Sequence, residues 1–290
     1  MEDVLIIKGL TKYYGKVKGV EDFSLNLKKG EVFGLIGPNG SGKSTTIRLI
    51  MNLLNKDKGE IYLFNELNKK GRLDIKKRIG YLPSEIHLYD DMKVKDVFDY
   101  HESFYNDDLK ERRQYLVDRL SIDENKKIED LSLGNLKKVG IVLAFMHNPD
   151  IIILDEPTSG LDPIIQQVFY QLILEEKLKG KTILYSTHIL QEISRVCDRV
   201  GIIKGGELLK VELVGELYKK NLTHVTISSK QIDKIISYLG IDDYVRVGQA
   251  IKFKNTIHPD DLIKSLSLYR IEDLLIEEAS LEDILLHYYR

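Results

Sequence analysis

The fold of this chain is decided by one stretch of sequence, Gly37-Pro38-Asn39-Gly40-Ser41-Gly42-Lys43-Ser44-Thr45. Its spacing, G-x-x-x-x-G-K-[ST], is that of a phosphate-binding P-loop. Residues 32–36 form a short apolar run typical of a buried strand, and residues 44–54 carry apolar side chains at helical spacing. A strand, a glycine-rich turn and a helix start together aim backbone N–H groups at an anion. The stretch therefore predicts a nucleotide-binding site.

Two side chains of this loop have specific chemistry. Lys43 supplies a positive charge for the outer phosphates, and the Ser44 hydroxyl is a ligand for Mg²⁺. Glycines are needed because the backbone curls tightly around the phosphates, where a Cβ would intrude. We expect all nine residues to contribute to binding the phosphates of a nucleotide, with Mg²⁺ as the partner ion.

The composition is that of an ordinary globular protein with a sizeable core. The chain has 290 residues, 43% of them hydrophobic, and a formal net charge of −2. The near-neutral charge gives no reason to expect nucleic acid as a partner. The single Cys197 excludes an intrachain disulfide framework. The acidic N-terminus lacks the pattern of a signal peptide, and the longest apolar run, 151–154, is too short for a membrane span.

Residues 1–216 alternate between strand-like and helix-like segments, which predicts an α/β domain with a mainly parallel sheet. We expect a P-loop NTPase core, an antiparallel β subdomain, and a helical lobe inserted at about residues 83–148. Strands are expected at 4–10, 20–27, 32–36, 61–64, 79–82, 151–154, 182–186, 200–204 and 208–211. Helices are expected at 44–54, in two segments within 94–120, and at 136–146, 164–178 and 190–196.

The pattern restarts after about residue 216, so we expect residues 217–290 to form a small α+β domain. Strands at 225–227, 244–247, 251–253 and 270–276 enclose helices at 232–239 and 259–266, and a last helix is expected at 281–289. The order βαββαβ is that of the ferredoxin-like motif.

A second polar group follows an apolar strand at residues 151–154. Asp155 and Glu156 stand at the end of this run. In an open parallel sheet, ligand groups lie at the carboxyl ends of the strands, so both carboxylates should lie beside the P-loop. Asp155 is then placed to hold Mg²⁺. Glu156 is placed to accept a proton from an attacking water molecule. The alternative is a solvated acidic strand end.

Three further stretches occur in a characteristic order with the P-loop. They are Leu131-Ser132-Leu133-Gly134-Asn135, Ser159-Gly160-Leu161-Asp162, and His188 after a strand. Each stretch alone is weak evidence for a function, since Ser-x-Gly before a helix is often only a helix cap. Together they make residues 3–216 resemble the ATP-binding subunit of ABC transporters. The C-terminal region, including residues 281–289, resembles the tail of ABC-2 type exporters of drugs and antibiotics.

The resemblance implies a role for each matching position. Gly37 to Thr45 would be the Walker A loop, and Asp155 with Glu156 the Walker B carboxylates, Glu156 being the general base. His188 would be the switch histidine that contacts the γ-phosphate together with Lys43.

The resemblance also assigns residues outside these two motifs. Tyr14 would stack on adenine, with Tyr13 as its competitor. Ser132 and Gly134 of the signature motif and Asp162 of the D-loop would contact ATP bound by a second subunit.

Two departures from the family pattern matter. The signature reads Leu-Ser-Leu-Gly-Asn rather than Leu-Ser-Gly-Gly-Gln, although Ser132 and Gly134 remain. Ser84 stands after Tyr81-Leu82-Pro83, where the family has a glutamine that contacts the metal. A water molecule could bridge the gap, Glu85 could replace the glutamine, the contact could be absent, or Ser84 could merely cap a following helix.

We therefore expect an ATP-hydrolysing subunit that powers an ABC exporter. Its partners would be a second copy in a head-to-tail dimer, or a related ATPase subunit, and a polytopic membrane permease encoded separately. The protein would be soluble alone and held at the cytoplasmic face of the membrane by that permease. The alternatives are an ABC-type ATPase without a membrane partner, a non-hydrolysing module that dimerises on ATP, and, least, an importer subunit.

Overall fold

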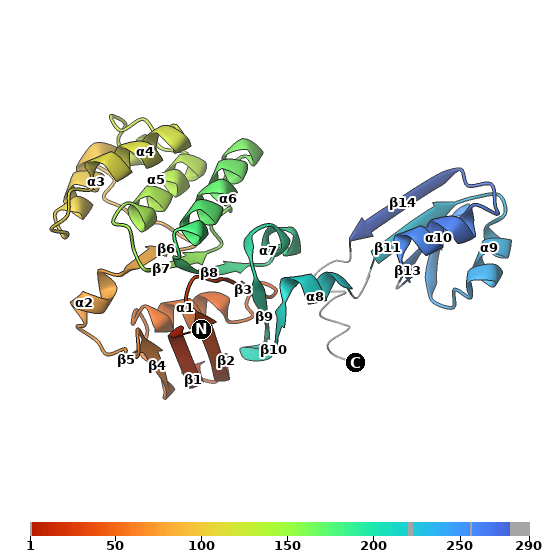
Figure 1. Ribbon diagram of the computed structural model, residues 1–290, viewed down its shortest axis with the longest axis horizontal. Helices are drawn as coiled ribbons and strands as arrows, with labels where there is room; N and C mark the ends of the chain where they lie inside the picture. The colour runs from red at the N-terminus through yellow and green to blue at the C-terminus, as the bar shows by residue number, and fades with distance from the viewer. Residues whose placement is uncertain (1, 220–222, 256, 279–290) are drawn as a thin grey trace. The chain divides into compact units, whose positions relative to one another are not determined.

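The computed structural model describes residues 2–219, 223–255 and 257–278 (Figure 1). It divides into two compact units, Met1–Val214 and Gly215–Arg290. The division falls two residues before the expected boundary at residue 216. The helix expected at 281–289 lies outside the described residues.

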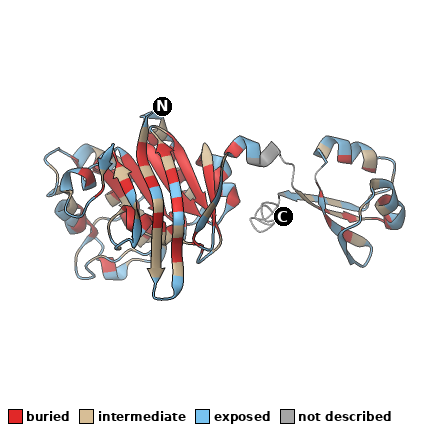
Figure 2. Ribbon diagram, turned by 90° about the horizontal axis from the view of Figure 1, so that it is seen from below, coloured by how far each residue is buried: buried red, intermediate tan, exposed pale blue. Residues whose placement is uncertain are grey.

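A six-stranded sheet forms the centre of the first unit. Its strands, in spatial order, are β10 (Glu207–Leu213), β9 (Arg199–Lys204), β3 (Val32–Ile36), β8 (Thr182–Thr187), β7 (Ile151–Asp155) and β6 (Ile79–Leu82). All neighbouring pairs are parallel except β10 with β9, which form a hairpin. Strands β3, β7 and β8 are buried at every residue, as is usual when both faces of a parallel sheet are covered (Figure 2). The mainly parallel α/β sheet is confirmed.

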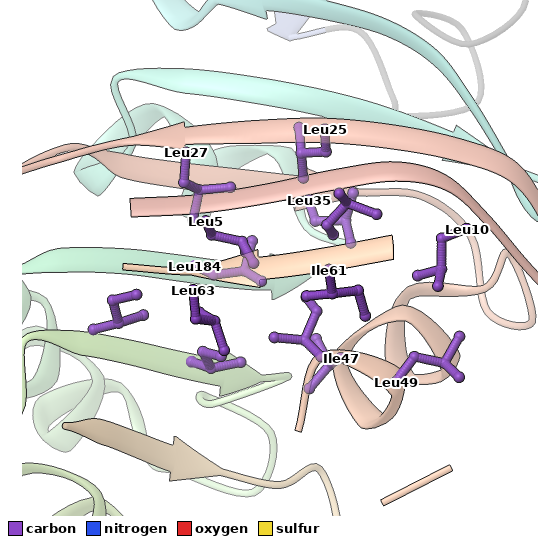
Figure 3. Close-up of a cluster of buried hydrophobic side chains, with 14 of the residues drawn as sticks. Leu5, Leu10, Leu25, Leu27, Leu35, Ile47, Leu49, Ile61, Leu63 and Leu184 are labelled. Carbon is purple, nitrogen blue, oxygen red and sulfur yellow. The ribbon is translucent and has the colours of Figure 1, made fainter. Parts of the chain in front are cut away.

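An antiparallel sheet packs beside it. Its order is β2 (Val17–Lys28), β1 (Asp3–Tyr14), β4 (Lys58–Leu63) and β5 (Glu66–Leu67). The core between the sheets includes Leu25 and Leu63 from the antiparallel sheet, Leu35 and Leu184 from the parallel one, and Ile47 from helix α1 (Lys43–Ile50) (Figure 3). The helix that follows the P-loop is thus fixed by both sheets.

The expected helical lobe contains α3 (Val94–Glu102), α4 (Lys110–Leu120) and α5 (Leu133–Phe145), with a 3-10 turn at Ile128–Asp130. Figure 1 shows these helices gathered on the side of the parallel sheet away from the antiparallel one. Helices α6 (Pro163–Leu178) and α7 (Leu190–Val196) follow β7 and β8, and the short α2 (Leu73–Lys76) and α8 (Val214–Lys219) were not expected. None of the described helices is long and apolar enough to cross a membrane.

Several element ends differ from expectation. Helix α1 ends at Ile50 rather than residue 54, because Asn52 adopts a left-handed conformation with φ of 56°. Strand β1 continues to Tyr14 rather than stopping at residue 10, through irregular pairing with β2. Strand β14 (Asp273–Glu278) begins three residues later than expected.

The second unit is a four-stranded antiparallel sheet with two helices. The sheet order is β12 (Tyr244–Val247), β13 (Ala250–Asn255), β11 (Thr223–Ser228) and β14. Helices α9 (Ile232–Leu239) and α10 (Pro259–Leu266) follow β11 and β13, so the chain runs βαββαβ. The unit has its own apolar core, which includes Val225, Ile235 and Leu262.

Candidate functional site

The P-loop wraps closely on its neighbours. Gly42 precedes helix α1 with φ of 109°, a conformation that favours glycine. A Cβ on Gly42 would lie 2.7 Å from the carbonyl oxygen of Gly19, and one on Gly37 would lie 2.2 Å from that of Ile203. Both positions therefore require glycine, and the loop is held against β2 and β9.

A cavity of about 300 Å³ opens over this loop. It is lined by Tyr14, Val17, Lys18, Gly19, residues 39–45 and Glu156. The structure therefore brings Tyr14, most of the P-loop and Glu156, which are far apart in the sequence, to the same cavity.

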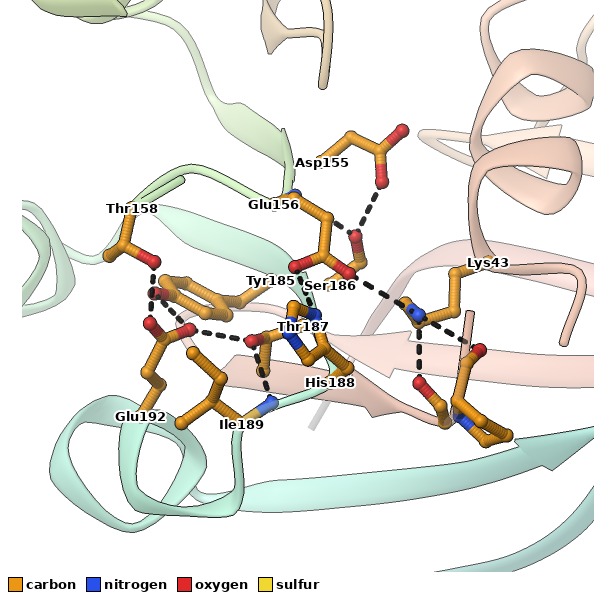
Figure 4. Close-up of polar contacts among 12 residues, drawn as sticks. Lys43, Asp155, Glu156, Thr158, Tyr185, Ser186, Thr187, His188, Ile189 and Glu192 are labelled. Atoms are coloured by element: carbon orange, nitrogen blue, oxygen red, sulfur yellow. Dashed lines mark hydrogen bonds and ion pairs between the residues drawn. The ribbon is translucent and has the colours of Figure 1, made fainter. Parts of the chain in front are cut away.

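Lys43 is buried within the loop. Its Nζ donates to the carbonyl oxygens of Gly37 and Pro38 at 2.8 and 3.3 Å and lies 3.3 Å from Glu156 Oε1 (Figure 4). The backbone of the loop thus holds the ammonium group, which also forms an ion pair with Glu156, the residue that follows β7.

Glu156 also contacts His188. Glu156 Oε2 lies 2.9 Å from His188 Nδ1, and the Glu156 backbone is left-handed with φ of 48°. This backbone turn at the end of β7 directs the side chain toward Lys43 and the residue after β8 (Figure 4). One carboxylate therefore joins the P-loop lysine to the histidine, as expected for residues at the carboxyl ends of adjacent parallel strands.

Asp155 has one free oxygen. The side chain is fully buried, and its Oδ1 accepts a hydrogen bond of 2.7 Å from the Ser186 hydroxyl. Its Oδ2 is buried and has no hydrogen-bond partner among the residues that the structure describes. An unpartnered carboxylate oxygen at this strand end fits a hard divalent cation such as Mg²⁺. Ser44, the other expected ligand, lines the cavity.

The described residues contain no group of three or more His, Cys, Asp or Glu side chains suited to hold a metal ion. Mg²⁺ commonly uses only one or two carboxylates and completes its ligands with water and substrate phosphates. Asp155 and Ser44 fit that kind of site, in which the nucleotide supplies the remaining ligands.

The two adjacent tyrosines have different surroundings. Tyr14 lines the cavity, is 45% exposed, and has its hydroxyl 3.5 Å from Thr45 Oγ1. Tyr13 donates a 2.6 Å hydrogen bond to Glu21, and this hydrogen bond is the main cause that raises the pKa of Tyr13. Only Tyr14 therefore presents its ring to the cavity.

The residues expected to contact a second subunit lie outside the cavity lining. Ser132 caps helix α5 by accepting a hydrogen bond from the Asn135 backbone, and Asp162 caps α6 by accepting from Ile164 and Ile165 at 3.0 Å. Ser132 and Asp162 are exposed. Both residues thus have a structural role as helix caps within their own chain.

Gly134 brings the two capped loops together. A Cβ on Gly134 would lie 2.5 Å from the carbonyl oxygen of Gly160, so only glycine allows this approach. The start of α5 therefore packs against the loop that leads to Asp162.

The Ser84 segment is held by a residue that we did not expect from the sequence. Lys137 on α5 is only 2% exposed and donates to the carbonyl oxygens of Ser84 and Pro83 at 2.8 and 3.3 Å. Burial lowers the pKa of Lys137, while Asp155 and Glu156 act in the opposite direction. The charged lysine thus links the start of the signature helix to this loop.

The capping alternative for Ser84 is wrong. The first α-helix after Ser84 begins at Val94, and its N-cap residue is Lys93. Glu85 is exposed, and its Oε2 lies 3.8 Å from Nε2 of exposed His87. In this conformation Glu85 is directed to solvent rather than to the site.

Sequence reasoning also missed Lys18 and Ser186. Lys18 lines the cavity and lies 2.5 Å from Glu207 and 3.3 Å from Glu21. Ser186 is the register partner of Asp155 in the parallel pair of β8 and β7. Aligning the ends of the two predicted strands would have found the Ser186 contact. No sequence signal pointed to Lys18.

Comparisons with known proteins identify the family of this chain. The family model described as ABC transporter matches residues 20–159, which include the P-loop, the signature motif and both acidic residues. An ABC transporter ATP-binding protein of Methanocaldococcus jannaschii is 35% identical over 96% of this chain and 100% of its own length. The bacitracin transport ATP-binding protein BcrA of Bacillus licheniformis is 30% identical over 92% of this chain and 86% of its own length.

Solved structures are similar to about three quarters of this chain. The ATP-binding subunit of an ABC transporter superposes with a TM-score of 0.70 and 29% identity, over 75% of this chain and 93% of that one. A dimeric ATP-binding cassette bound to ADP and Pi has a TM-score of 0.66 and 26% identity, over 72% of this chain and 98% of that one. These matches confirm the resemblance seen in the sequence. This chain belongs to the ATP-binding proteins of the ABC transporter family.

Proposed function

We propose that this ATP-binding subunit hydrolyses ATP and thereby powers a separate membrane subunit of an ABC exporter. The observation that carries the proposal is the position of Glu156, 3.3 Å from Lys43 and 2.9 Å from His188. A carboxylate beside a phosphate-binding lysine is placed to take a proton from water at the γ-phosphate. A site built only to bind ATP has no need of that group.

Binding begins at the P-loop. The backbone N–H groups of the loop and the N-terminus of α1 favour the negatively charged phosphates, and Lys43 adds a full charge. The exposed ring of Tyr14 is available to stack on the base of the nucleotide. Any nucleobase can stack on such a ring.

Hydrolysis requires Glu156 to leave Lys43. An incoming phosphate competes for the Lys43 ammonium, and the freed carboxylate can then accept a proton from the attacking water. His188 holds the other carboxylate oxygen and is available to contact the γ-phosphate. Mg²⁺, held by Asp155 and Ser44, would neutralise the phosphate charge that builds up during the reaction.

A second copy, or a related ATPase subunit, would complete the site. Ser132, Gly134 and Asp162 are absent from the cavity lining of their own chain, which supports contacts with ATP on another subunit. A head-to-tail dimer would be an isologous assembly related by a two-fold axis. The dimeric cassette with ADP and Pi shows that a similar protein assembles as a pair.

The exporter assignment rests on relatives. The bacitracin transport protein matches most of this chain, and the linearmycin resistance ATP-binding protein LnrL of Bacillus subtilis is 34% identical over 78% of it. The proposed partner is a polytopic permease, which would hold this chain at the cytoplasmic face of the membrane.

The test is phosphate release by the purified full-length chain, with Mg²⁺ and with an excess of chelator. We expect turnover with Mg²⁺ and none with chelator. Co-expression with a polytopic membrane protein encoded beside this chain should raise the turnover and yield a stable complex. ATP binding without phosphate release, alone and with that partner, would instead favour a non-hydrolysing module.

A further inference from the structure

A second glutamate lies buried behind the catalytic carboxylate. Glu192 on α7 is 3% exposed and accepts hydrogen bonds from three hydroxyl groups (Figure 4). Its Oε1 accepts from Thr158, and its Oε2 accepts from Thr187 at 2.6 Å and from Tyr185 at 3.1 Å. No cation lies within ion-pair distance of Glu192 among the described residues, so neutral donors alone stabilise this buried charge.

The positions of these donors connect them to the site. Thr158 is two residues after Glu156, and Thr187 directly precedes His188. Thr187 Oγ1 also accepts a 3.0 Å hydrogen bond from the Ile189 backbone N–H. This bond connects the two residues that flank His188 in the sequence. Glu192 therefore joins the backbone segments that carry the two site residues.

A carboxylate suits this task better than an amide. The Thr187 hydroxyl accepts from the Ile189 backbone and donates its single proton to Glu192, because a carboxylate has no proton to donate in return. Burial and the nearby Glu192 charge raise the pKa of Tyr185 well above its usual value, so this hydroxyl also stays protonated and donates. A glutamine would replace one acceptor oxygen by a donor NH₂ group facing such hydroxyls.

We infer that Glu192 is a positioning residue for ATP hydrolysis, which sets Glu156 and His188 relative to each other through Thr158 and Thr187. The inference rests on the proposed function, because it assigns Glu192 to the reaction of that site. His188 needs such support because its ring is exposed and contacts the Glu156 side chain, which must itself be held in place. Glu192 itself touches neither substrate nor the reacting atoms.

The first test compares Glu192→Gln with wild type in ATP turnover and ATP binding. Misplacement of reacting groups by about 1 Å can lower the rate by on the order of 10²-fold. We expect kcat to fall about 10- to 100-fold while ATP affinity changes by less than about threefold. In a Glu156→Gln background the same substitution should cause no further loss, because both act on one step.

Glu176→Gln is the matched control. Glu176 on α6 is 1% exposed and contacts Arg112 and Lys179, away from the loops that carry Glu156 and His188. It should lower thermal stability without lowering kcat. A second pair, Thr187→Val and Thr187→Ser, removes or keeps one hydroxyl donor. Thr187→Ser should retain most of the kcat that Thr187→Val loses. This pair of variants tests the inference if Glu192→Gln does not fold.

Histidine ring resonances, measured by NMR in the full-length protein, give a readout that needs no turnover. Those of His188 should move in Glu192→Gln and Thr187→Val but not in Thr187→Ser, while those of His258 in the second unit should not move. If wild type releases no phosphate, the proposed function fails, and the resonances still test the Glu192 link. Unchanged kcat in folded Glu192→Gln, unchanged His188 resonances, or equal losses of kcat in Glu176→Gln would overturn the inference.

Discussion

Replacing Tyr14 by alanine tests how the base is held. The ring is 45% exposed at the cavity, and it lies against Gly19, where a Cβ would be 2.9 Å from Tyr14 Cε2. Base–aromatic stacking contributes about 1–3 kcal/mol. At about 1.4 kcal/mol per tenfold change, Tyr14→Ala should weaken ATP binding about 5- to 140-fold.

The assay is equilibrium binding of a fluorescent ATP analogue, with ATP, GTP and CTP as competitors. Tyr14→Phe keeps the ring and loses only the 3.5 Å contact with Thr45, so it should bind nearly as wild type. Discrimination among the three nucleotides should be shallow, because stacking reads no base edge. If Tyr13→Ala weakens binding as much as expected here and Tyr14→Ala does not, the wrong tyrosine has been assigned.

Three further predictions concern other parts of the chain. Burial, with a smaller effect of His147, lowers the pKa of His101 to about 4. A folded pKa below the ordinary value of 6.5 means that stability is lost as pH falls, so the free energy of unfolding should drop by about 2 kcal/mol between pH 7 and pH 5 in urea titrations. His101→Gln should reduce this drop, exposed His87→Gln should not, and equal drops in both would contradict the reasoning. A chain ending after Lys219 keeps the first unit and should bind ATP as the full chain does; a folded truncation without ATP binding would show that the second unit contributes to the site. Glu85→Gln should leave the Mg²⁺ dependence of turnover unchanged, whereas loss of turnover in it would place Glu85 in the site; Ser84→Gln, compared with Ser84→Ala, tests whether a longer side chain restores a metal contact.

The sequence was sufficient for the parts of the site that depend on local geometry. The P-loop can be read from glycines at fixed spacing. Asp155 and Glu156 end an unbroken apolar strand, so the rule for parallel sheets predicted that they lie near the P-loop. In the structure, Lys43 Nζ and Glu156 Oε1 lie 3.3 Å apart, which agrees with that rule.

Contacts between segments distant in sequence could not be predicted in the same way. Lys137 reaches the Ser84 carbonyl through the packing of α5 against β6, and Glu192 accepts hydrogen bonds from hydroxyl groups of two segments, the loop after β7 and strand β8. A buried charge of either kind looks in the sequence like an ordinary exposed helical residue, because only the tertiary fold desolvates it.

The end of helix α1 was missed for a related reason. Apolar side chains continue at helical spacing past residue 50, but Asn52 turns left-handed and its amide donates a 2.7 Å hydrogen bond to Asn68. That tertiary contact outweighs the local periodicity.

The most direct measurement is phosphate release by Glu156→Gln at saturating ATP and Mg²⁺, with ATP affinity and molecular mass measured on the same samples. Glutamine keeps the shape of the side chain but cannot accept the proton, and it no longer competes for Lys43 as a charged partner. Turnover should fall by on the order of 10²-fold or more, while ATP binds at least as tightly and holds the protein as a dimer. Phosphate release at the wild-type rate would show that Glu156 is not the general base.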